Sequence, residues 1–265
     1  MQVLAEGESV MDNDRRKIAF VAGSSRGMGK EIARVLLREQ YRTLITGRDA
    51  SSLNVTLEEF KREFGTDVLS FEGDLTSAEA IRQAVETVRR TWGESLDCLV
   101  VNVGSGRGKV GWKLNEDDWQ DSFETNFWGP VRIAQAAIPT LRSGGTIIFI
   151  ASIAGLERLP APLPYSAAKA ALLNYAKNLS CVLADSSIRV NCIAPGNILV
   201  PGGSWDAHLR DRRDEVLQYI QSEVPSKRFG TPEEVAETVG FLSSAKASFI
   251  TGACIVVDGG QSRTL

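Results

Sequence analysis

Tyr165 and Lys169 are the pair of residues in this chain best suited to acid–base chemistry. The chain has four tyrosines, and only Tyr165 has a lysine four residues later. On a helix this spacing places both side chains on one face, with about 6 Å of rise between them. A free tyrosine has a pKa of about 10, and a neighbouring ammonium group lowers that pKa. The pair therefore predicts a tyrosine that exchanges a proton with a substrate oxygen.

Ser152 and Asn126 are expected to join this pair at one edge of a sheet. Ser152 ends an apolar run with the pattern of a buried strand, and its hydroxyl can hold a carbonyl oxygen in place. Asn126 precedes that strand in a helical segment and is suited to anchor a water relay behind Lys169. A ketone that accepts a hydride develops negative charge on its oxygen and needs a proton. The four residues therefore predict interconversion of a ketone and a secondary alcohol.

A glycine-rich turn, Gly23-Ser24-Ser25-Arg26-Gly27-Met28-Gly29, joins the first apolar run to the first helical segment. Glycines let the backbone turn tightly and approach a pyrophosphate, and the following helix N-terminus offers free N–H groups. The spacing is GxxxGxG rather than the GxGxxG dinucleotide fingerprint. We interpret the turn as a phosphate loop. The alternative, a turn without a ligand, is weakened by its position at the first strand–helix junction.

The end of the second expected strand favours NADP(H) over NAD. An acid at this position would bind the ribose 2′-hydroxyl, but the strand ends at Gly47-Arg48. Arg48 can pair with a 2′-phosphate, and Arg26 adds a second positive charge. Asp49 is expected to cap the next helix. The alternative for Arg48 is a solvated surface arginine.

Apolar runs alternate with helical segments along most of the chain. Nearly continuous apolar runs are typical of strands buried on both faces of a parallel sheet. The alternation predicts a single α/β domain with a doubly wound, Rossmann-like, seven-stranded parallel sheet. The expected strands are 18–23, 43–47, 68–74, 97–102, 145–152, 188–194 and 253–260. The expected helices are 27–39, 50–64, 77–92, 116–141, 163–184 and 232–243.

Two segments fall outside this alternation. Residues 1–15 contain acids and lack the apolar centre of a secretory signal, so we expect a flexible tail before a domain spanning 16–265. Residues 197–225 follow Pro195-Gly196, contain Pro201-Gly202-Gly203 and continue as a charged helical stretch. We expect this segment to be a substrate lid, mobile without ligand and ordered with cofactor and substrate bound. The alternative is a permanently packed helix.

Composition narrows the possible partners. Lys and Arg total 30 against 33 Asp and Glu, a net charge of −3, which argues against nucleic acid or anionic membrane as the main partner. No apolar stretch approaches the ~18 residues of a membrane span. Four cysteines without CxxC spacing are expected to be small buried residues in a reducing compartment, and we predict a cytoplasmic protein. His208 is the only histidine, so a metal site or a Ser-His-Asp triad is not expected.

Taken together, these motifs resemble the short-chain dehydrogenase/reductase family over residues 16–262. The resemblance is carried by the glycine-rich turn, Asn102-Val103-Gly104, the four catalytic candidates and Pro195-Gly196. It implies that Tyr165 is the acid/base, Ser152 orients the substrate, and Asn126 holds the water relay. Lys169 would bind the nicotinamide ribose and tune Tyr165. The implied cofactor contacts are Gly23, Ser25, Arg26, Gly27, Met28, Gly29, Arg48, Asp74, Leu75, Asn102, Gly104, Tyr165, Lys169, Pro195, Gly196 and Ile198.

Two positions depart from the family pattern. Val101-Asn102-Val103-Gly104 replaces Asn-Asn-Ala-Gly, a mild change. Val200 stands where the family usually has a threonine that bonds the cofactor carboxamide. That contact is therefore expected from the backbone near Ile198 or from another residue of 197–204.

The resemblance defines the reaction better than the substrate. The nearest likeness is to 3-oxoacyl-carrier-protein reductases, which carry basic residues for an acidic carrier. Those positions hold Ser143 and Ser186 here, with Arg142 and Arg189 as neighbours. Reduction of a sugar or polyol ketone, or of a secondary-metabolite ketone, stays open, as does a non-catalytic NADP-binding sensor. The resemblance also implies a homo-oligomer, a tetramer or a dimer, formed through 116–141, 163–184 and 253–257.

Overall fold

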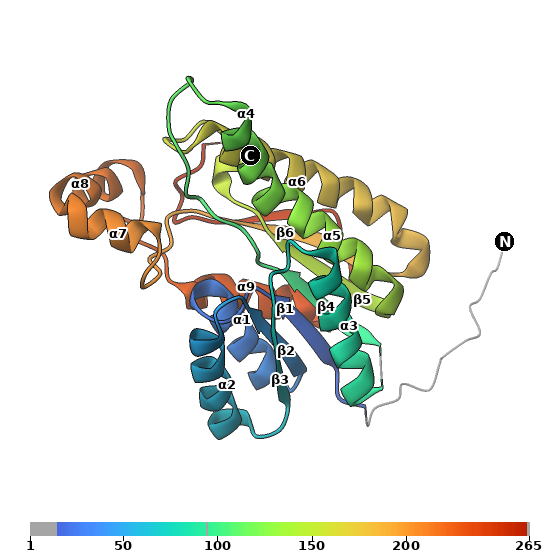
Figure 1. Cartoon of the computed structure of the whole chain (residues 1–265). Coiled ribbons are helices and arrows are strands. Elements are labelled where there is room, and N and C mark those ends of the chain that lie inside the picture. The colour runs from blue at the N-terminus through green and yellow to red at the C-terminus, as the bar shows by residue number, and fades with distance from the viewer. Residues whose placement is uncertain (1–14, 94, 264–265) are drawn as a thin grey trace.

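Seven parallel strands form one central sheet with helices on both faces (Figure 1). The computed structural model describes residues 15–93 and 95–263. The strand order is β3-β2-β1-β4-β5-β6-β7, which confirms the predicted doubly wound fold. Because the order reverses between β1 and β4, a crevice is expected at the carboxyl ends of these strands. The strands are β1 Ile18–Ala22, β2 Arg42–Gly47, β3 Val68–Glu72, β4 Leu96–Val101, β5 Leu141–Ile150, β6 Arg189–Pro195 and β7 Cys254–Val257.

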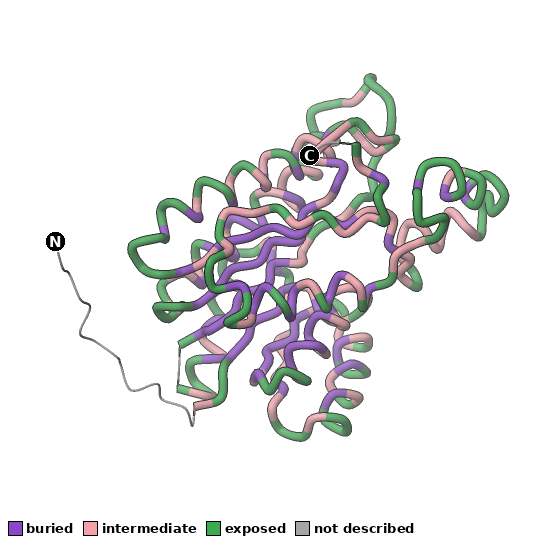
Figure 2. The backbone as a smooth tube through the Cα atoms, turned by 180° about the vertical axis from the view of Figure 1, so that it is seen from behind, coloured by how far each residue is buried: buried purple, intermediate pink, exposed green. Residues whose placement is uncertain are grey.

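Two helical layers enclose the sheet. Helices α1, α2 and α9 pack on one face, and α3, α5 and α6 on the other. Along β1, Ile18 and Phe20 face the α3–α5–α6 layer, whereas Ala19 and Val21 face the α1–α2–α9 layer. Figure 2 shows the resulting band of buried strands through the middle of the molecule. The helices are α1 Gly27–Arg38, α2 Ala50–Phe64, α3 Ala78–Trp92, α4 Glu116–Phe123, α5 Gly129–Ala137, α6 Leu163–Val182, α7 Ser204–Asp211, α8 Arg213–Glu223 and α9 Pro232–Ser243.

The prediction of one helix over 116–141 is wrong. The segment contains α4, a π-helical turn over Glu124–Trp128, α5 and a 3₁₀ turn over Ile138–Thr140, and β5 begins at Leu141. Pro130 has no N–H to donate to the Asn126 carbonyl four residues earlier. The N–H of Gly129 accordingly bonds the Glu124 carbonyl, five residues back. The wider turn falls at Asn126, and such turns often occur at functional sites.

The 197–225 segment contains α7 and α8, which stand apart from the rest of the fold in Figure 1. The two helices meet at Arg212, whose backbone is not helical. Most of the predicted tail lies outside the described residues. Its last residue, Arg15, donates a hydrogen bond to the Ser95 carbonyl at 2.7 Å. None of the helices in the described part of the chain is long and apolar enough to cross a membrane.

The expectation that all four cysteines are buried is wrong for two of them. Cys98 and Cys192 are buried on central strands, whereas Cys181 and Cys254 are exposed. Cys254 lies on β7, the last strand in the order of the sheet that the structure describes.

Candidate active site

A cleft of about 1270 Å³ lies beyond the carboxyl ends of the central strands. Its wall includes the glycine-rich turn after β1, the residues after β4 and β5, the start of α6 and the segment after β6. All the predicted catalytic and cofactor residues line this cleft except Gly29 and Asn126, which lie behind its surface. The two exceptions are buried and contact lining residues. The sequence-predicted site is therefore brought together in one place.

The glycine-rich turn has a shape that fits a phosphate group. Gly23 and Gly27 have φ of +75° and +58°, a region that favours glycine. A methyl group on Gly29 would lie 2.0 Å from the Gly23 carbonyl oxygen, so no larger residue fits there. Arg26, the N-cap of α1, makes no side-chain capping bond. The first N–H groups of α1 are thus without a side-chain cap beside the cleft, as an anion site requires.

Three polar side chains hold this turn in place. Asn102 donates from Nδ2 to the Gly23 carbonyl at 2.8 Å. Thr46 accepts from the Gly23 N–H at 2.9 Å, and its own N–H donates to the Ser24 hydroxyl at 2.9 Å. The hydrogen-bonding roles of Ser24 and Thr46 were not predicted, because both residues lie within ordinary strand and turn patterns.

The end of the cleft beside β2 and β3 carries the residues expected to select the cofactor. Arg48 and Asp74 form an exposed ion pair at 3.9 Å, with 76% and 49% of their side chains accessible. Such an exposed pair contributes little, so the guanidinium can turn toward a phosphate. Asp49 caps α2, as predicted: its carboxylate accepts from the Ser52 N–H at 2.8 Å, and this bond lowers the pKa of Asp49. Arg26 lies close enough to lower it further.

Ser152, Tyr165 and Lys169 meet where β5 ends against α6. The Ser152 side chain lies close enough to the Tyr165 hydroxyl to affect its pKa. The Lys169 Nζ lies 5.9 Å from the centroid of the Tyr165 ring and donates to the Ile150 carbonyl at 3.0 Å. Gly155 allows the turn after β5 to lie against α6, because a methyl group on Gly155 would lie 2.7 Å from the Lys169 backbone. The predicted placement of Tyr165 and Lys169 on one face of a helix is confirmed.

The pKa of Tyr165 differs from the expectation. Burial raises the pKa of Tyr165, and the neighbouring Ser152 side chain opposes that rise. Burial also lowers the pKa of Lys169, to about 8. Without a bound cofactor, desolvation by burial therefore has a larger effect on both pKa values than attraction between the phenolate and the ammonium. A raised pKa keeps the hydroxyl protonated at neutral pH, which suits a proton donor.

Asn126 acts on the wall of the cleft from behind. It is 1% exposed, and its Oδ1 accepts from the Ser105 N–H at 2.8 Å. Its Nδ2 donates to the Ser105 carbonyl at 3.1 Å and to the Ser122 carbonyl at 3.0 Å. A methyl group on Gly104 would lie 3.0 Å from both Asn126 Oδ1 and Lys169 Nζ, so the two side chains flank Gly104. Asn126 thereby fixes the loop after β4 beside Lys169.

Around Tyr165 the cleft has a mixed lining of polar, aromatic and apolar side chains. Trp205 stacks on Tyr219, with ring centroids 5.6 Å apart and 19° between the ring planes. His208 meets Trp205 edge-on, with centroids 5.6 Å apart. The lining from the β4–α4 loop and from helices α7 and α8 includes the apolar residues Val110 and Val216 as well as Arg107, Trp205, His208, Arg212, Glu215 and Tyr219. This end can offer hydrogen-bond donors and acceptors to a substrate.

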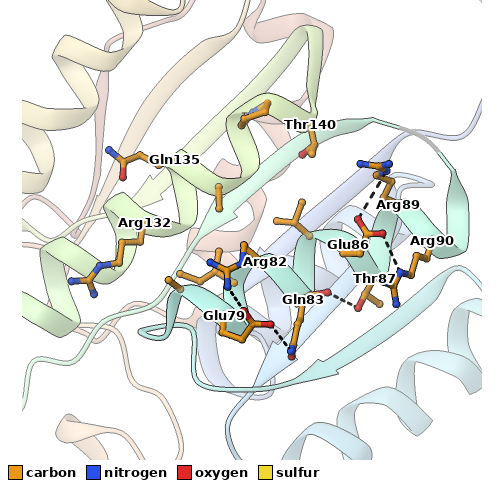
Figure 3. Close-up of a pocket in the computed structure, with 15 residues that line it drawn as sticks. Glu79, Arg82, Gln83, Glu86, Thr87, Arg89, Arg90, Arg132, Gln135 and Thr140 are labelled. Atoms are coloured by element: carbon orange, nitrogen blue, oxygen red, sulfur yellow. Dashed lines mark hydrogen bonds and ion pairs between the residues drawn. The ribbon is translucent and has the colours of Figure 1, made fainter.

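A second hollow, of about 850 Å³, lies between α3 and α5 (Figure 3). Figure 3 shows Arg82 paired with Glu79 along α3, and Arg89 and Arg90 both paired with Glu86. None of the predicted site residues lines this hollow. Among the described residues no group of three or more His, Cys, Asp and Glu could hold a metal ion. The cleft at the sheet edge is therefore the candidate active site.

Comparison with known proteins agrees with this geometry. A family model described as Enoyl-(Acyl carrier protein) reductase matches residues 22–262. The 3-oxoacyl-[acyl-carrier-protein] reductase FabG of Aquifex aeolicus is 33% identical over 247 residues, covering 92% of this chain and 97% of that protein. Glucose 1-dehydrogenase 2 of Bacillus subtilis is 33% identical over 251 residues, covering 93% of this chain and 95% of that protein.

Among solved structures, L-sorbose reductase from Gluconobacter frateurii, complexed with NADPH and L-sorbose, is similar in fold and sequence. The TM-score is 0.86 and the identity 34%, over 94% of this chain and 98% of that chain. The chain therefore belongs to the short-chain dehydrogenase/reductase family. It is an oxidoreductase that acts on CH–OH and C=O groups with a nicotinamide dinucleotide.

Proposed function

We propose that this protein reduces a polar ketone to a secondary alcohol with NADPH, with Tyr165 as the proton donor. The observation that carries the proposal is the meeting of Ser152, Tyr165 and Lys169 in the same cleft as the phosphate loop. Bound NADPH would supply the hydride that reduces the carbonyl carbon. The chain's own residues then have two tasks, to hold the carbonyl oxygen and to deliver a proton to it.

The proton step follows from the contacts of Tyr165. Its protonated hydroxyl donates to the carbonyl oxygen while the Ser152 hydroxyl donates a second hydrogen bond to the same atom. As the proton moves, negative charge passes to the phenolate. The ammonium of Lys169, whose Nζ lies 5.9 Å from the centroid of the Tyr165 ring, would stabilise that negative charge. Asn126 keeps the neighbouring loop in place and, as the resemblance implies, anchors the relay that returns a proton.

The NADPH preference is assigned to Arg48, supported by Arg26. Removing one charge-assisted contact with the 2′-phosphate in Arg48→Ala should weaken NADPH binding about 10- to 150-fold. NADH has no 2′-phosphate, so its binding should stay nearly unchanged. Fluorescence titration of both cofactors measures the two dissociation constants. Arg62→Ala, which removes an exposed arginine of α2 outside the cleft, is the matched control. Equal losses for NADPH and NADH would refute the assignment.

The rate of ketone reduction should fall as the pH rises above about 8. Burial lowers the pKa of Lys169 to about 8, so the side chain is charged below this pH and neutral above it. A neutral lysine no longer stabilises the phenolate, and kcat/KM should fall about tenfold per pH unit at the limit. Initial rates of NADPH oxidation across the pH range give this profile. Lys177→Met, on the same helix but outside the cleft, should leave it unchanged. A level rate up to about pH 10 would assign no such role to Lys169.

The substrate is proposed to be a polyhydroxylated ketone of the sugar or polyol type. Arg107, His208 and Glu215 give the substrate end of the cleft several hydrogen-bonding groups, which suit the hydroxyl groups of a sugar or polyol. The related L-sorbose reductase is described with NADPH and L-sorbose.

The other candidate, a 3-oxoacyl group on an acidic carrier protein, finds less support in the chain's surface. Arg142 is paired with Asp97 at 3.2 Å, and Arg189 donates to the Leu242 carbonyl at 2.8 Å. The two arginines that could replace the missing basic residues are thus bound to the chain itself. Oxidation of NADPH with L-sorbose and with acetoacetyl-CoA compares the two substrate classes. Faster turnover of the thioester would reverse the choice of substrate and leave the reaction unchanged.

The homo-oligomer implied by the resemblance stays a prediction. Light scattering during gel filtration of the full chain measures its mass, and a monomer would contradict the expected dimer or tetramer.

A further inference from the structure

Residues 258–263, here called the C-terminal clasp, follow β7 and contact both ends of the 197–225 segment. The carboxylate of Asp258 shapes the clasp by accepting from the N–H groups of Gly260, at 2.9 Å, and Ser262, at 2.6 Å. Gly259 has φ +66° and accepts at its carbonyl from the Ser226 hydroxyl at 2.9 Å. The exit of the lid segment is therefore attached to the clasp.

Gln261 is the buried centre of the clasp, with 5% of its surface exposed. Its Oε1 accepts from Asn197 Nδ2 at 2.7 Å, and its Nε2 donates to the Tyr219 hydroxyl at 2.9 Å. Asn197 lies directly after Pro195-Gly196, at the entry to the lid segment. Tyr219 lies on α8. One planar amide thus joins the entry of the lid to its second helix.

The amide also determines where an aromatic wall of the cleft lies. Tyr219 stacks on Trp205, and both side chains line the cleft that holds Tyr165. Gln261 itself does not line the cleft. It can therefore influence a substrate only through the residues that it holds. Val216 and Ile220 are the buried residues of α8, and the Arg263 guanidinium of the clasp also contacts Glu223 at the end of this helix.

We propose that Gln261 is a positioning residue for ketone reduction. It holds Tyr219, and through it Trp205, at the distance from the catalytic tyrosine that a bound substrate requires. The proposal rests on the proposed function, because the wall matters only if a ketone binds beside Tyr165. A satisfied buried amide also stabilises the fold, so the test needs a readout that general destabilisation does not move.

The test compares three variants of the full chain. Gln261→Met keeps the length of the side chain and removes both hydrogen bonds. Tyr219→Phe removes the bond to α8 and keeps the ring. The matched control is Gln221→Met. Gln221 is an exposed glutamine of α8, the helix that carries Tyr219, and its side chain donates to the Lys227 carbonyl at 3.0 Å. Kinetics with L-sorbose, or with whichever ketone the wild type turns over, give KM and kcat separately, and titration gives the NADPH affinity.

In Gln261→Met we expect KM for the ketone to rise about 5- to 10-fold, as the loss of two hydrogen bonds implies. Tyr219→Phe should raise KM by a smaller factor, and the double variant should be no worse than Gln261→Met. NADPH affinity should stay within about twofold, since the phosphate loop is untouched. Hydrogen exchange of residues 204–223 should be faster in Gln261→Met than in the wild type or in Gln221→Met.

Two results would overturn the positioning role. One is a KM in Gln261→Met equal to that of Gln221→Met, with unchanged exchange of 204–223. The other is an equal fall of kcat and NADPH affinity with unchanged KM, which describes a destabilised fold. Failure of the proposed function is distinct from both, because the wild type would then turn over no ketone while the exchange difference could still be measured.

Discussion

Replacement of Tyr165 by phenylalanine should lower kcat by about 10²- to 10⁴-fold, the range typical of a lost general acid. The ring stays in place against Ser152 and Lys169, and only the hydroxyl that donates the proton is removed. NADPH affinity should change little, because the phosphate loop and Arg48 are not altered. Steady-state NADPH oxidation with a ketone, together with cofactor titration, separates these two effects.

Tyr175→Phe is the control for this change. Tyr175 lies on the same helix, ten residues further along, and packs edge-on against Phe127 and Phe149 rather than in the cleft. Its hydroxyl has no place in the proposed chemistry, so this variant should have the wild-type rate. If Tyr165→Phe turned over at the wild-type rate too, the proton donor would be a different group.

Replacement of Ser152 by alanine should lower kcat by about 10²- to 10³-fold, as the loss of one donor to a developing oxyanion does. In this structure the Ser152 hydroxyl contacts Tyr165 and accepts from the Ala154 N–H at 3.1 Å, so it is held in one place. The alanine variant should keep NADPH affinity, and single-turnover kinetics should show the loss in the chemical step.

Loss of the cap on the 3₁₀ turn after β5 could also affect this variant. Ser244→Ala controls for it, because Ser244 caps another 3₁₀ turn in the same way, accepting from the Lys246 N–H at 3.2 Å. Ser244 lies outside the cleft, so Ser244→Ala should keep the full rate. Equal rates for the two alanine variants would leave Ser152 with a structural role alone.

Much of the fold and of the site could be predicted because their signals are local in sequence. The run Ile18–Ala22, the glycine turn and the start of α1 are consecutive, and each follows from the chemistry of its own residues. The pairing of Tyr165 with Lys169 follows from helix geometry alone. A parallel sheet then brings the ends of β1, β4 and β5 to one edge, which is why residues far apart in sequence could be assigned to one site.

Other features depend on contacts that no local pattern reports. The pKa of Tyr165 is raised because surrounding elements bury the side chain, a quantity that spacing does not contain. Gln261 reaches partners 42 and 64 residues away, so its contacts with Tyr219 and Asn197 could not be predicted. By contrast, the break in the predicted 116–141 helix had a local cause in Pro130, which has no N–H to donate to the Asn126 carbonyl.

The proposed reaction is tested most directly by hydride transfer to a ketone. The purified full chain is incubated with NADPH dideuterated at C4 of the nicotinamide and with L-sorbose or another polyhydroxylated ketone, and the alcohol is analysed by mass spectrometry. We expect one deuterium on the carbinol carbon with the wild type, and about 10²- to 10⁴-fold less labelled alcohol with Tyr165→Phe over the same time. A wild-type chain that binds NADPH but transfers no deuterium to any ketone tested would contradict the proposal and describe a cofactor-binding sensor.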